Sequence, residues 1–101
     1  MKQVCKDFLT EQFGDEDVVK EICAEYVTSI QQKLAELDTA MASKNWTDLD
    51  HIAHAIKGNA LATGDNEMAD TAIQLRLSTK LQDEQNASKL IAQLKEFAKE
   101  I

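Results

Sequence analysis

The chain of 101 residues is long enough for one hydrophobic core and too short for two, so residues 1–101 are expected to fold as a single domain. It contains no proline, three glycines and 44% hydrophobic residues, a composition that suits helices and leaves little material for tight hairpins. The formal charge of -7 argues against a nucleic-acid partner, which requires clustered Lys and Arg.

Targeting and membrane signals are weak throughout the chain. Its apolar runs are only a few residues long, whereas a membrane-spanning helix needs roughly 20. The opening segment MKQVCKDFLTEQF carries charges every few residues, so no signal peptide is expected. Cys5 and Cys23 are too far apart for a CxxC pair and lie among apolar neighbours, which predicts buried free thiols in a reducing compartment. These features predict a cytoplasmic protein without membrane contact.

Two helices are expected in the first part of the chain. A short apolar stripe that ends near Gly14 predicts a short helix or lid, and its residues are Val4, Cys5, Phe8 and Leu9. Asp15 is suited to cap a second helix, because its side chain can accept a hydrogen bond from a free backbone N–H. Apolar residues then recur every three or four positions over about six to seven turns; they are Val18, Ile22, Tyr26, Ile30, Leu34, Leu37 and Met41.

Three further helices follow from the same periodicity. Asn45 caps the third helix, which ends at Gly64 and has the apolar residues Trp46, Leu49, Ile52, Ala53, Ile56 and Ala60. The fourth begins near Asp65 and has Met68, Ala72, Ile73 and Leu75. The last is capped near Asp83 and has Ala87, Leu90, Ile91, Leu94, Phe97, Ala98 and Ile101. The predicted fold is all-α, an antiparallel four-helix bundle with a short N-terminal helix packed on it.

Both histidines of the chain fall on the third helix. With an advance of about 100° per residue, the apolar residues of this helix gather around Leu49, which defines the direction of the core. His54 then lies about 140° away from Leu49, on the solvent side. The solvent-facing set is Thr47, His51, His54, Gly58 and Leu61.

Gly58 is unexpected in this helix, because an internal glycine costs about 1 kcal/mol relative to alanine. Helical side chains lean toward the N-terminus, so a side chain at position 58 would cover His54. Glycine leaves the imidazole bare, while Lys57 lies close enough to hold an anion attached to the ring. Leu61 adds an apolar patch for a protein partner. The pattern indicates a nucleophile that the active site of another protein must reach.

These residues resemble a known family. The segment AHAIKGNALATG resembles the signature of histidine phosphotransfer (HPt) domains, with the matching positions His54, Lys57, Gly58 and Gly64. The resemblance implies a phosphorelay intermediate, which accepts a phosphoryl group on His54 from the aspartyl phosphate of a receiver domain of a hybrid sensor histidine kinase. It then passes the group to the aspartate of a response regulator. The resemblance also implies a monomer with no ATP-dependent kinase activity and no cofactor of its own, since the receiver supplies Mg²⁺.

The resemblance also implies roles for the neighbours of His54. Lys57 would offset the charge of the phosphoryl oxygens, with Asn59 and Arg76 as further phosphate contacts, although Arg76 could equally be a plain surface charge. Docking of the receiver would involve Thr47, His51, Ala55, Gly58 and Leu61 together with neighbouring parts of the fourth helix, and Gly64 would be structural. Asn59 replaces the small hydroxyl residue that is frequent in the family, and Asp65 replaces an apolar one. These departures concern phosphate contact and the bend between the third and fourth helices.

Two other functions are compatible with parts of the pattern. One is a protein-binding module that kept the helical bundle without phosphotransfer. The other is a metal-binding bundle, suggested by the carboxylate and imidazole of Asp48 and His51. Such bundles need two pairs of this kind and further carboxylates pointing inward, whereas only one pair is present and His51 faces outward, so no metal site is expected. Met1 and the natural-looking ends favour an independent protein over a domain excised from a kinase.

Overall fold

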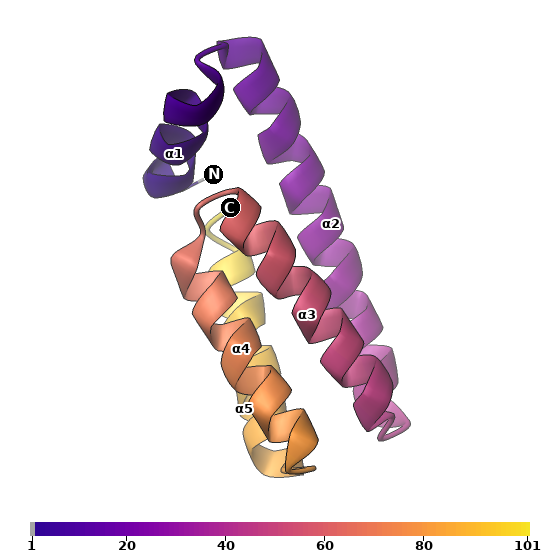
Figure 1. The fold of residues 1–101 in the computed structure, drawn as a ribbon. Helices are drawn as coiled ribbons and strands as arrows, with labels where there is room; N and C mark the ends of the chain where they lie inside the picture. Colours follow the sequence, from indigo (N-terminus) through magenta and orange to yellow (C-terminus); the bar gives the residue numbers. More distant parts are fainter. Residues whose placement is uncertain (1) are drawn as a thin grey trace.

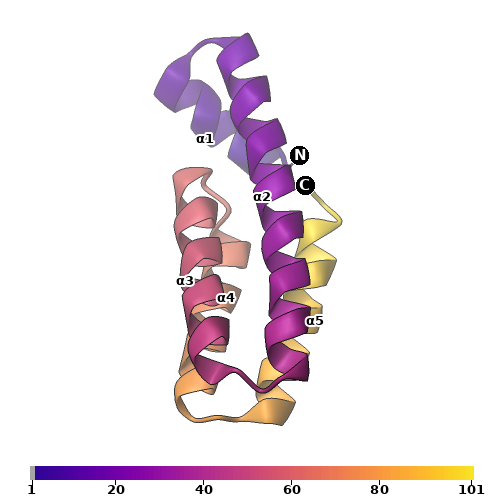
Figure 2. The same cartoon turned by 90° about the vertical axis from the view of Figure 1, so that its right-hand side faces the viewer.

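The computed structural model describes residues 2–101 and is helical over most of that range. The helices are α1 (Gln3–Phe13), α2 (Glu16–Ala42), α3 (Trp46–Ala62), α4 (Asn66–Lys80) and α5 (Glu84–Ala98). The C-terminal part of α2 packs against α3 and α5, and α4 packs against the same two helices from the other side. α1 lies next to the N-terminal part of α2, beyond the turn between α3 and α4 (Figures 1 and 2). The all-α prediction is confirmed. No helix within residues 2–101 has the length and apolar character that crossing a bilayer requires.

Side-chain caps define where four of the helices begin. Asp15, Asn45, Asp65 and Asp83 each accept a hydrogen bond from a backbone N–H in the first turn of the helix that follows. These N–H groups have no partner within the helix, so a cap stabilises the start of the helix. Two glycines with left-handed backbone occupy the other predicted boundaries: Gly14 after α1 and Gly64 after α3. All six predicted boundary residues are confirmed.

One apolar core joins α2, α3, α4 and α5. Its largest fully buried side chains are Ile30, Leu37, Leu49, Ile56, Met68, Leu75 and Leu94. Three residues predicted for the apolar faces are instead exposed: Val4 (55%), Val18 (37%) and Ile73 (40%). On a helix Ile73 lies about 160° around from Leu75, so both cannot face the core. In α2 it is Val19, beside α1, that is buried in place of Val18.

The two cysteines lie in different environments. Cys5 is fully buried, as predicted, and burial raises the pKa of its thiol to about 11. Cys23 is only partly buried, because it lies at the edge of the contact between α1 and α2. The prediction of a buried thiol is therefore wrong for Cys23. Both cysteines are free.

A buried carboxylate joins the N-terminal segment to α2 and α4. Asp65 is 1% exposed and accepts hydrogen bonds from the Tyr26 hydroxyl at 2.7 Å and from Lys2 Nζ at 2.9 Å. Burial raises the pKa of Tyr26, and the hydrogen bond to Asp65 raises it further. Burial works to lower the pKa of Lys2, but hydrogen bonds to Asp65 and Glu67 outweigh it and raise that pKa. Because a buried charge is costly without partners, these contacts make the position of Asp65 specific.

Substitution of Gly64 by alanine is expected to destabilise the fold more than the same change at Gly14. Both residues have similar positive φ angles, 72° and 70°, which cost a non-glycine residue about 1–2 kcal/mol. A Cβ atom at position 64 would also lie 2.6 Å from Cγ of Phe8, whereas the space around position 14 is open. Overpacking of this kind adds about 1–3 kcal/mol. Urea denaturation of the two variants measures the difference, and equal losses of stability would contradict the close packing of α1 on Gly64.

Candidate functional site

The exposed imidazole of His54 on α3 faces an arginine from α4. The Nη1 atom of Arg76 lies 3.0 Å from Nδ1 of His54. A guanidinium group has N–H donors and no acceptor, so Nδ1 must accept this hydrogen bond with its lone pair. The neutral ring therefore carries its proton on Nε2 in this arrangement. Arg76 therefore contacts His54 directly, while its role as a phosphate contact stays a prediction.

Arg76 is itself held in place by α3. Its Nε atom donates a hydrogen bond to Oδ1 of Asp50 at 3.0 Å, and the hydroxyl of Thr79 lies 3.4 Å from the same oxygen. The hydrogen bond from Arg76 holds the pKa of the Asp50 carboxyl below its usual range, against the opposing effect of desolvation. The Thr79 hydroxyl donates to the backbone oxygen of Arg76 at 2.6 Å, so the polar network to His54 runs from Asp50 through Arg76.

The turn between α3 and α4 places His54 and Arg76 at the same distance along their two helices. Only Thr63, Gly64 and Asp65 separate the two helices. His54 is eleven residues before Asp65 and Arg76 is eleven residues after it. Since a helix rises 1.5 Å per residue, both lie about 16 Å from the turn, side by side on the hairpin.

Most of the other predicted site residues share the exposed side of α3. Thr47, His51, Gly58 and Leu61 are exposed, as the helical wheel predicts, and Leu61 exposes 49% of its surface. Ala55 and Lys57 are half-buried, and Lys57 forms no ion pair with residues 2–101. The solvent-facing prediction for α3 is confirmed, while the docking and phosphate-binding roles of these residues stay predictions.

Asn59 lies on a different side of α3. Its Nδ2 atom donates a hydrogen bond of 2.8 Å to the Ser29 hydroxyl on α2, and on a helix it lies about 140° around from His54. The structure therefore directs this amide toward α2 and does not bring it together with His54 and Arg76. A phosphate contact by Asn59 stays a prediction, and it requires the bond to Ser29 to break.

Sequence reasoning missed Asp50 and Thr79. Asp50 precedes His54 by four residues and Thr79 follows Arg76 by three, spacings that place both pairs on common helix faces. The spacing within each helix does not show that the two pairs meet, because the contact between them joins α3 to α4. Finding it from the sequence would require knowing which residues of α3 and α4 lie opposite each other. The exposed apolar residues Ile73 and Leu77 of α4 (40% and 57% exposed) were also missed as possible parts of the site's surroundings.

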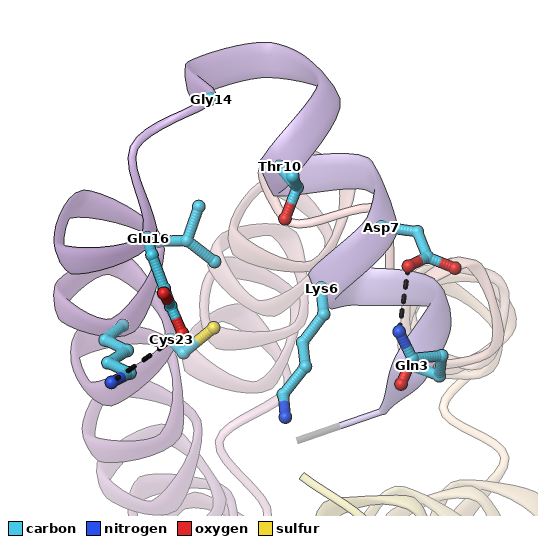
Figure 3. A pocket seen from close by; sticks show the side chains of 9 residues that line it. Gln3, Lys6, Asp7, Thr10, Gly14, Glu16 and Cys23 are labelled. Carbon is cyan, nitrogen blue, oxygen red and sulfur yellow. Dashed lines mark hydrogen bonds and ion pairs between the residues drawn. The ribbon is translucent and has the colours of Figure 1, made fainter.

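A groove between α1 and α2 lies apart from this site (Figure 3). Lys6 and Cys23 extend toward the space between the two helices, and no residue of α3 or α4 lines it. Its polar residues are partly paired with one another: Gln3 donates to Asp7 at 2.8 Å, and Lys20 lies 3.9 Å from Glu16. Within residues 2–101 no three His, Cys, Asp or Glu side chains are grouped so that they could hold a metal ion.

Comparison with protein families shows that the model of the Hpt domain matches residues 21–101. The chain belongs to the Hpt domain family. Such domains serve histidine phosphotransfer in two-component phosphorelays and interact with receiver domains, so the recognition made from the His54 segment is confirmed. The match leaves out α1 and the first residues of α2. Comparisons of this Hpt domain with curated proteins and with solved structures give no match.

Replacement of Gly58 separates a requirement of the fold from a requirement of the site. Apart from the surrounding backbone of α3, no atom of residues 2–101 lies within 4 Å of a Cβ built at Gly58. Gly58→Ala is therefore expected to stabilise the domain by about 0.5–1 kcal/mol. Gly58→Gln is also expected to fold, but its side chain would lean over His54 and slow phosphoryl transfer strongly. Denaturation midpoints and transfer rates measured on the same variants test both effects. A variant that melts earlier and transfers normally would show that Gly58 serves packing.

Proposed function

We propose that this Hpt domain is a phosphorelay intermediate that uses His54 as its phosphoacceptor. It accepts a phosphoryl group from the aspartyl phosphate of a receiver domain, such as that of a hybrid sensor kinase, and passes the group to the aspartate of a response regulator. The observation that carries the proposal is the exposed His54 ring, bonded to Arg76 through Nδ1 and left uncovered by Gly58. His51 is also exposed but lacks this arginine contact among the described residues.

The charges around His54 suit a transferring phosphoryl group. Lys57 lies one turn along α3, and the guanidinium of Arg76 already reaches the ring. Two cationic side chains near the imidazole would offset the negative charge of the phosphoryl oxygens as the group arrives. In this proposal Mg²⁺ comes from the receiver, and the domain itself supplies no cofactor and no ATP-dependent kinase activity.

The proposed docking surface combines the solvent-facing side of α3 with apolar residues of α4. It comprises Thr47, His51, Ala55, Gly58 and Leu61 of α3 together with Ile73 and Leu77 of α4. Exposed apolar side chains beside a reactive group are typical of a protein-binding surface. The proposal treats the protein as a cytoplasmic monomer, with α2 to α5 as an antiparallel four-helix bundle that carries α1 as a short addition.

Substitution of the acceptor tests the proposal directly. His54→Gln is expected to abolish labelling from a phosphorylated receiver domain without loss of helicity, because the side chain is exposed. The label on the wild-type domain should be labile in acid and resistant to alkali, as a phosphoramidate is. His51→Gln removes the other imidazole and should still be labelled, although more slowly, because His51 belongs to the proposed docking surface. Equal labelling of the His54→Gln domain would refute the assignment, and a receiver that binds without labelling any residue would favour a module without phosphotransfer.

Leu61→Glu tests the docking surface. A carboxylate at this exposed position should weaken binding of a receiver domain by roughly tenfold, since it replaces an apolar contact and must be desolvated at the interface. The effect on folding should stay within about 0.5 kcal/mol, as is usual for surface sites. Transfer rates at increasing receiver concentration, together with a denaturation curve, separate the two effects. Wild-type transfer by this variant would show that the receiver docks elsewhere.

A further inference from the structure

The side chain of Asp50 is linked to the imidazole of His54 through the guanidinium of Arg76. Its carboxylate accepts the Nε hydrogen bond of Arg76 at 3.0 Å, while Nη1 of the same guanidinium lies 3.0 Å from Nδ1 of His54. We propose that Asp50 is a positioning residue, which holds Arg76 against Nδ1 of His54 and thereby prolongs the lifetime of the phosphohistidine. This inference rests on the proposed function of His54 as phosphoacceptor.

The geometry explains how one carboxylate can aim the arginine. The guanidinium is a rigid planar fork, so a bond at Nε determines where Nη1 points. The Arg76 side chain is 28% exposed, and a long side chain at such a position has many competing rotamers. The bond to Asp50, with Thr79 on the same oxygen, selects the rotamer that reaches the imidazole.

The position of Arg76 also determines which nitrogen carries the phosphoryl group. Arg76 covers Nδ1, which leaves Nε2 as the acceptor. In the transfer Nε2 forms the bond to phosphorus, and the bond from phosphorus to the aspartate oxygen breaks, its electron pair leaving with the carboxylate. The ring proton, which is on Nε2 at rest, passes through water to Nδ1 while Arg76 moves aside. It is released to solvent when Arg76 returns to Nδ1.

The returned arginine protects the product from hydrolysis. Water cleaves the N–P bond fastest when Nδ1 is protonated, because the ring can then leave as neutral imidazole and not as an anion. Arg76 competes with a proton for the lone pair of Nδ1, and its charge repels that proton. The other titratable groups around the ring are His51, Asp50 and Lys57 on α3, with Lys80 of α4 acting on Asp50. A direct effect of the Asp50 charge would favour protonation of the ring, so it has the opposite sign.

Chemical loading allows a test that needs no receiver. Potassium phosphoramidate phosphorylates imidazole directly, and His51→Gln as the common background leaves His54 as the acceptor. The lifetime of the phosphohistidine is then followed by ³¹P NMR from acidic to neutral pH. Asp50→Asn is expected to shorten the lifetime near neutral pH by roughly two- to fivefold, the factor typical of an exposed charge pair, and to move the acid-catalysed limb to higher pH.

Three comparisons separate positioning from a structural role. Arg76→Gln should shorten the lifetime at least as much. The double variant should decay no faster than Arg76→Gln alone, since the stabilising effect of Asp50 is exerted through Arg76. Arg76→Lys keeps the positive charge but lacks the planar guanidinium with its several N–H donors. The phosphohistidine should therefore be short-lived in this variant too. Asp38→Asn is the control, because it breaks the 2.8 Å ion pair between Asp38 and Lys95 and should leave the lifetime unchanged.

An unchanged or longer lifetime in Asp50→Asn would overturn the proposal. So would a double variant that decays faster than Arg76→Gln, or a phosphoryl group located on Nδ1. If Asp50→Asn fails to fold, an unchanged lifetime in both Arg76 variants overturns the proposal equally. Because loading is chemical, a shortened lifetime supports the role of Asp50 even if no receiver transfers a phosphoryl group to the domain. A shortened lifetime together with no transfer from any receiver would contradict the proposed function but not the role of Asp50.

Discussion

The buried carboxylate of Asp65 is the interaction on which the arrangement of this Hpt domain depends. Asp65 is the N-cap of α4, accepts a hydrogen bond from the hydroxyl of Tyr26 on α2, and forms an ion pair with Lys2 just before α1. An isolated charge in the core would be strongly unfavourable, so the fold retains this residue only where all three partners meet it. The turn between α3 and α4 is thereby placed against both α1 and α2. The bend between α3 and α4 is thus secured by polar contacts.

The site follows from the position of that turn. Once Asp65 is placed, His54 and Arg76 face each other at equal distances along the two helices, and Asp50 comes within reach of the guanidinium. The network is local to one hairpin, yet each of its members would be an ordinary surface residue on an isolated helix. A change in the turn would shift α4 along α3 and separate Arg76 from the imidazole. The fold thus acts on the chemistry through helix register.

Gly64 and Gly58 occupy the same segment for different physical reasons. Gly64 has a positive φ and lies against Phe8, so it is required by the close approach of α1. Gly58 lies in open space within a regular helix, where alanine would be the more stable choice. The domain keeps a weaker helix next to His54, which is consistent with access of a large partner to the ring. Conflicts between local stability and sequence choice are expected at functional positions.

The sequence by itself determined the local features of this protein. Apolar periodicity and the caps at Asp15, Asn45, Asp65 and Asp83 depend only on nearby residues, and so do the exposure of His54 and the signature around it. Only the tertiary structure decided which residues of different helices meet. The contacts of Arg76 with His54 and Asp50, the bond from Asn59 to Ser29, and the exposure of Val18 and Ile73 all depend on how helices pack and align. Helical periodicity gives the direction of a side chain around its own axis, whereas the axial alignment of two helices comes from the turn and the core between them.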